Sequence, residues 1–88
     1  MVSVLTSTDR YFLVVHQSGP RVTDVVEFGP GEREAAYARL FAVEAEHLGR
    51  PETQVILLVA ESLETLEVTH GSIFRDVHLT HRLHGVGE

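Results

Sequence analysis

Apolar residues near the start of the chain fall into two short runs that predict paired strands. Residues 11–16 and 22–28 are rich in β-branched and aromatic side chains, and the five residues between them include Gly19 and Pro20. A connection of that length and composition is typical of a hairpin turn. We therefore expect a β-hairpin over these residues, with His16 at the end of its first strand facing solvent.

The spacing of apolar residues then becomes helical. Two glycines around Pro30 end the second run, and Pro30 at the first helical position, with Glu32 and Glu34 in the first turn, predicts the start of a helix. Gly49 is suited to the left-handed conformation that ends many helices. We expect the first helix to extend from Pro30 to about Leu48.

The rest of the chain predicts a strand, a second helix and a final strand. Gln54 to Ala60 is apolar without alternation, as expected of a central strand that is covered on both faces. Ser62 can cap a second helix that extends to His70 or Phe74. Residues 76–83 alternate between apolar and polar positions, which predicts a half-buried strand, with a loosely docked tail as the alternative.

Together these elements predict a single α+β domain over residues 1–88, in the order β-β-α-β-α with a final β if the tail is a strand. A right-handed crossover through the first helix makes the third strand parallel to the second and antiparallel to the first. We expect a two-layer fold, in which a mixed sheet of three to four strands carries both helices on one face. Residues 1–9 and 85–88 are expected to be loose ends.

Each predicted helix has an apolar stripe when its residues are placed at 100° intervals. In the first helix the stripe is Tyr37, Leu40, Phe41 and Leu48, with Glu44 in its middle. In the second helix it is Leu63, Leu66, Ile73 and Phe74, with His70 in its middle. Because a lone buried charge is costly, Glu44 and His70 are expected to pair in the shared core. The alternatives are that Glu44 reaches past the stripe to water and that His70 caps its helix.

Composition narrows the class of protein. The 88 residues are 43% hydrophobic and include no cysteine. This is the composition of a globular domain without disulfides or thiolate zinc sites, and it fits a reducing, cytoplasmic setting. The first ten residues lack the pattern of a secretory signal, and the longest apolar run, Val55 to Ala60, is too short to cross a membrane.

The charge balance argues against nucleic acid as a partner. The formal net charge is −6, and residues 27–67 account for all of it, with nine glutamates against three arginines. A surface of this sign repels phosphates, so we expect neither nucleic-acid binding nor a membrane partner.

Familiar catalytic motifs are absent from the sequence. It contains no phosphate-binding glycine loop, nucleophile elbow or His-Glu-x-x-His signature. In the tail, strand alternation directs His81 away from His78 and His84, so these three histidines do not converge. Glu44 and His47 have the Glu-x-x-His spacing of carboxylate-bridged metal bundles, but the chain has one copy of that motif where such bundles need more.

One stretch of the chain resembles known sequences. Residues 54–74, QVILLVAESLETLEVTHGSIF, place an apolar strand before Glu-Ser, a short helix, and Thr-His ahead of an aromatic residue, and Ala45-Glu46-His47 near the end of the first helix is similar too. This pattern is similar to one in small uncharacterised proteins of actinobacteria and their phages, over residues 11–74. The resemblance implies the order of the elements and no activity.

The sequence predicts a non-enzymatic binding or regulatory module that acts through protein–protein contacts, as a homodimer or bound to a protein partner. Helices on one face would leave the other sheet face open, and apolar side chains on both faces of the strands make such a face an interface. The alternative is a small-ligand or metal-binding domain, conceivably a small enzyme, that uses Glu44, His47 and His70. The sequence identifies no catalytic residue, no resident cofactor and no defined metal site.

Overall fold

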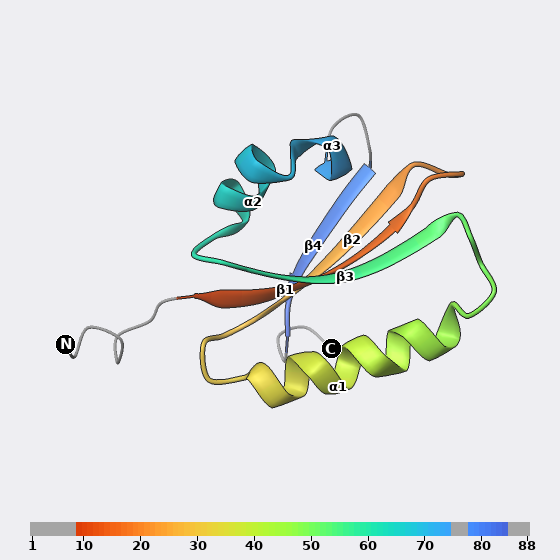
Figure 1. Ribbon diagram of the computed structural model, residues 1–88. Coiled ribbons are helices and arrows are strands. Elements are labelled where there is room, and N and C mark those ends of the chain that lie inside the picture. Colours follow the sequence, from red (N-terminus) through yellow and green to blue (C-terminus); the bar gives the residue numbers. More distant parts are fainter. Residues whose placement is uncertain (1–8, 75–77, 85–88) are drawn as a thin grey trace.

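Four strands form one mixed sheet at the centre of the computed structural model, which describes residues 9–74 and 78–84 (Figure 1). The strands are β1 (Arg10–Gln17), β2 (Val22–Phe28), β3 (Thr53–Ala60) and β4 (His78–Leu83). β1 pairs antiparallel with both β2 and β3, and β4 pairs parallel with β2, which gives the order β3-β1-β2-β4. The predicted mixed sheet, hairpin and final strand are confirmed. The predicted loose ends lie outside the described residues, except for Asp9.

Three helical segments complete the order β-β-α-β-α-β: α1 (Arg33–Glu46), α2 (Leu63–Thr69) and the short α3 (Gly71–Phe74). α1 begins later than predicted, because Pro30 belongs to the preceding turn and Glu32 stands at the N-cap position. The Glu32 carboxylate accepts the backbone N–H of Gly29 at 2.7 Å and closes that turn. Gly49 follows α1 in the predicted left-handed conformation, with φ of 79°. No helix of the described residues is long and apolar enough to span a membrane.

The helices cover opposite faces of the sheet, so the prediction that both helices lie on one face is wrong (Figure 1). α1 packs over β1 and β3 on one face, and α2 packs on the other. The reason lies in the strands, where successive residues point to opposite faces. Phe12 and Val14 of β1 join the core on the α2 face, while Leu13 between them joins the core on the α1 face. A strand with apolar residues on both faces has to be covered on both, and α1 covers one face while α2 covers the other.

β3 lies at an edge of the sheet and not at its centre. Its run of apolar residues is covered on both faces by α1 and α2, which is what its composition predicts. The prediction of a central strand is nonetheless wrong, because β3 passes beyond β1 and pairs with it alone. The apolar composition of a strand indicates that its two faces are buried. It does not indicate whether the strand has a hydrogen-bonded neighbour on one side or on both.

α1 turns its largest apolar side chains to solvent. Its core contacts come from Ala36 and Val43, which are 0% and 9% exposed, whereas Tyr37, Phe41 and Leu48 are 38%, 63% and 79% exposed. The predicted stripe is therefore wrong, apart from Leu40, which packs against the core. The predicted stripe of the second helix is confirmed by Leu66, which is buried, and by Leu63 and Phe74, which pack against the same cluster; the side chain of Ile73 lies outside the described residues.

Candidate functional site

The predicted pair of Glu44 and His70 is not formed. Glu44 is exposed on α1, and His70 is exposed at the C-cap of α2, on the opposite face of the sheet. The backbone N–H of His70 donates to the carbonyl of Leu66 at 2.7 Å and ends its helix. The expected pairing failed because it assumed that both helices face one core.

Glu44 and His47 do come together, as their spacing on one helix predicts. They line an open groove of about 630 Å³ between the end of α1 and the start of β3, together with Leu48, Thr53 and Val55. The Nδ1 atom of His47 is buried and has no hydrogen-bond partner in the part of the chain that the structure describes. Among the described residues, no group of three or more His, Asp or Glu side chains is placed to hold a metal ion, so the metal-binding alternative lacks a ligand set there.

Three further histidines have defined neighbours: one near the end of β1, one in β4 and one directly after β4. His16 Nδ1 lies 2.7 Å from Thr23 Oγ1 across the hairpin, and His16 is half-buried, so its expected solvent-facing position is wrong. His81 of β4 and His84, which directly follows this strand, lie on opposite faces of the sheet, as alternation predicts. His84 stacks on Phe28 with 4.5 Å between ring centroids.

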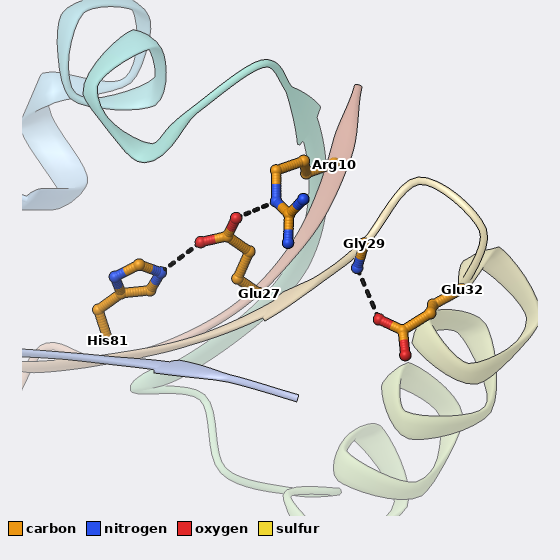
Figure 2. A network of polar contacts seen from close by, with 5 residues as sticks. All are labelled: Arg10, Glu27, Gly29, Glu32 and His81. Carbon is orange, nitrogen blue, oxygen red and sulfur yellow. Dashed lines mark hydrogen bonds and ion pairs between the residues drawn. The ribbon is translucent and has the colours of Figure 1, made fainter. Parts of the chain in front are cut away.

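A carboxylate joins three strands on the α2 face of the sheet (Figure 2). Glu27 of β2 accepts from Arg10 of β1 and contacts His81 of β4, with 2.7 Å between Glu27 Oε1 and His81 Nε2. The Glu27 side chain is 11% exposed, and the side chains of Arg10 and His81 are about a third exposed. A largely buried charge between two basic groups is well placed to hold β4 against the hairpin. Sequence reasoning missed this network, because its members are 17 and 54 residues apart.

An exposed apolar surface runs along one flank of α1. Tyr37 and Phe41 have ring centroids 6.5 Å apart, and the Arg33 guanidinium lies 5.3 Å from the centroid of Tyr37. Leu48 continues this flank beyond the end of the helix, beside Glu44. Glu44 and Leu48 line the groove with β3, so the flank faces the side of the sheet where β3 lies.

The outer edge of β3 presents unpaired backbone groups. Ser18 donates its N–H to the Glu52 carbonyl at 3.0 Å, and this hydrogen-bonded pair continues the β1–β3 register. Hydrogen-bonded pairs recur at every second position of an antiparallel ladder, so Val55, Leu57 and Val59 direct their N–H and C=O groups away from β1. No strand of the described residues pairs on that side. We refer to this edge together with Arg33, Tyr37, Phe41 and Leu48 as the α1–β3 surface.

Comparison with known proteins adds no further constraint on this surface. The resemblance to small actinobacterial and phage proteins stays a prediction. No protein-family model matches the chain, and neither a curated protein nor a solved structure does.

Proposed function

We propose that this protein is a cytoplasmic, non-enzymatic interaction module that acts as a homodimer through the α1–β3 surface. The open sheet face that favoured a homodimer on sequence grounds is covered by α1 and α2. The proposal rests instead on one observation, an uncharged apolar strand that ends the sheet beside exposed aromatic residues.

β3 has none of the features that protect an edge strand. Proteins protect such edges with charged residues, proline, bulges or a short strand, because an open edge is a template for pairing. β3 is eight residues long, TQVILLVA, with no charge and no proline, and its pairing with β1 is continuous from end to end. Val59 near its end is 51% exposed. These properties suit a strand that pairs with another strand.

A second copy of this chain fits that edge. Two β3 strands related by a two-fold axis at Leu57 pair antiparallel, with Val55 opposite the partner's Val59, and no charged residue of either strand lies in the pairing. Each α1 helix lies over the β1–β3 pair of its own copy, and neighbouring strands are about 4.8 Å apart. The axes of the two α1 helices are then about two strand spacings apart, which is close to the 8–10 Å between packed helices. The same axis therefore brings the two α1 helices side by side.

The charges on the exposed flank of α1 agree with this arrangement. Arg33 lies near the start of the flank and Glu44 near its end. A two-fold axis makes the two helices antiparallel, so Arg33 of each copy approaches the end that carries the partner's Glu44. Tyr37, Phe41 and Leu48, which are costly to expose as a patch, become buried between the helices.

Sedimentation of two variants tests the proposal. Val59→Lys adds a charge at the edge without changing a core residue, and Phe41→Ser removes the more exposed of the two aromatic side chains of the flank. We expect a wild-type dimer at micromolar concentration, and a dissociation constant raised about tenfold or more in each variant, since full burial of one such side chain is worth about 1.5–3 kcal/mol.

Matched changes elsewhere serve as controls. Leu83→Lys places the same charge on β4, the opposite edge, where Leu83 is 42% exposed, and Val68→Ser acts on α2, where Val68 is 84% exposed. Both control variants should remain dimeric. A monomeric wild-type protein would refute the proposal, as would a dimer that responds to Leu83→Lys and not to Val59→Lys.

A small-ligand role is the second candidate. The groove that Glu44 shares with His47 supports it, and His70 has no part in it because that residue lies across the sheet. Copper, zinc or other metal binding would need ligands that the described residues do not bring together.

A further inference from the structure

A second hollow, on the other flank of α1, is more enclosed than the groove beside β3. It lies between α1 and the part of the sheet formed by β1, β2 and β4, and its volume is about 180 Å³. That space equals about six molecules of liquid water. Its floor is aliphatic, made of Leu13, Val15, Val26 and Val43. It is therefore a space for a small molecule with an apolar part.

Four charged side chains line the hollow from two walls. Arg39 and Glu46 come from α1, where their spacing of seven residues places them on one side of the helix. Asp24 comes from β2 and Arg82 from β4, which pairs with β2 at Val26. None of the four has a hydrogen bond or ion pair with another described residue. The helix side and the sheet side of the hollow thus each present one cation and one carboxylate that make no ion pair with another described residue.

His47 lies where this hollow meets the groove beside β3, since it lines both. Its buried Nδ1 atom lacks a hydrogen-bond partner. Buried polar atoms without partners are rare and costly in folded proteins. No group of the described residues holds the imidazole at Nδ1, and a polar ligand at this junction would give this atom a partner.

We propose that the hollow binds a small zwitterion of the α-amino-acid class. Its carboxylate would lie toward Arg39 and Arg82, its ammonium group toward Asp24 and Glu46, and its side chain on the aliphatic floor. Two cations and two carboxylates make the lining neutral, which matches a ligand with both charges. Two carboxylates in a chain of net charge −6 oppose phosphates and other polyanions.

NMR titration with L-valine and its two half-molecules tests this assignment. Isovalerate lacks the ammonium group of valine, and isobutylamine lacks the carboxylate. With ¹⁵N-labelled wild-type protein we expect saturable amide shifts from valine at Val26, Val43 and Arg82, and none at Leu66 on the other face. Each half-molecule should bind at least tenfold more weakly, because it leaves one pair of charged groups without a partner.

Arginine substitutions supply the matched controls. Arg39→Gln and Arg82→Gln change exposed residues of the hollow and should abolish the valine shifts, while Arg21→Gln, at an exposed position of the hairpin turn outside both the hollow and the α1–β3 surface, should leave them unchanged. All three variants are expected to keep the wild-type spectrum elsewhere. Absence of saturable shifts with alanine, valine and leucine at millimolar concentration overturns the proposal. So does equal binding of isovalerate and valine, which would make the ligand a simple carboxylate, or valine binding that survives both hollow substitutions.

Discussion

At the scale of single residues, the most informative side chain is a glutamate that interrupts an apolar strand. Glu27 lies opposite Phe12 in the sheet and faces the α2 side, where an uncharged residue would be expected. It is kept there by Arg10 and His81, one from each side. Because one of these partners belongs to β4, Glu27 ties an edge strand to the hairpin.

Removing the charge of Glu27 should therefore cost stability. Glu27→Gln keeps the shape of the side chain but weakens both contacts and leaves Arg10 without its counter-charge, so we expect a loss of about 1–3 kcal/mol in the free energy of unfolding. Urea denaturation measures this. Glu67→Gln, at an exposed position of α2, should change it by less than about 0.5 kcal/mol. Equal effects of the two changes would mean that the network contributes nothing.

At the scale of the elements, the spacing of apolar residues along α1 indicates a helix but not which side of that helix faces the sheet. The start of α2 after Ser62 and the end of α1 before Gly49 follow from capping and turn residues and were predictable, whereas the start of α1 was predicted three residues too early. The orientation of α1 was not, because its sequence offers two apolar arcs, one large and aromatic, the other small. Periodicity favours the larger arc, while the structure buries the arc of Ala36 and Val43. Small side chains let a helix approach a sheet closely. Hydrophobicity scales do not include this advantage, because they rank side chains by their transfer from water alone.

Enlarging one alanine at a time tests the orientation of α1. Ala36 is 0% exposed, so Ala36→Leu should overpack the core and cost about 1–3 kcal/mol of unfolding free energy. Ala42 is exposed on the same helix, and Ala42→Leu should change it by less than about 0.5 kcal/mol. Thermal or urea unfolding of the two variants gives the comparison. A larger loss at Ala42 would show that the helix presents its other side to the sheet.

At the scale of the whole molecule, what matters is where the sheet stops. The sequence predicted which segments are strands, but strand order depends on contacts between residues far apart, and no local pattern reports it. That is why β3 was expected at the centre. Glu44 and His70 were expected to meet for another reason, because both helices were placed on one face of the sheet. Only the Glu44–His47 part of the candidate site was predictable, since those two residues share one helix.

Amide hydrogen exchange tests, residue by residue, whether the outer edge of β3 is paired with another strand. Ile56 and Leu58 direct their N–H groups to β1, so both amides should exchange slowly in any folded form of the chain. Val55 and Leu57 point outward and should be slow only in the dimer. We therefore expect continuous protection over residues 55–58 in the wild type and alternating protection in monomeric Val59→Lys. Alternation in both would rule out strand pairing at this edge, and fast exchange at Ile56 and Leu58 would contradict the sheet itself.

The parallel pairing of β4 with β2 also has a consequence for the order of folding. Each of its pairs joins residues 56 positions apart, as Val22 with His78, whereas the hairpin pair of Gln17 with Val22 closes a loop of four residues. Loop-closure entropy favours the short loop first, so the hairpin can form early while β4 docks last. During synthesis, no strand of the described residues lies on the outer side of β2 until β4 has been made. During that interval the nascent sheet has two unprotected edges, so the chain is most exposed to wrong pairing after β3 has been made and before β4 docks.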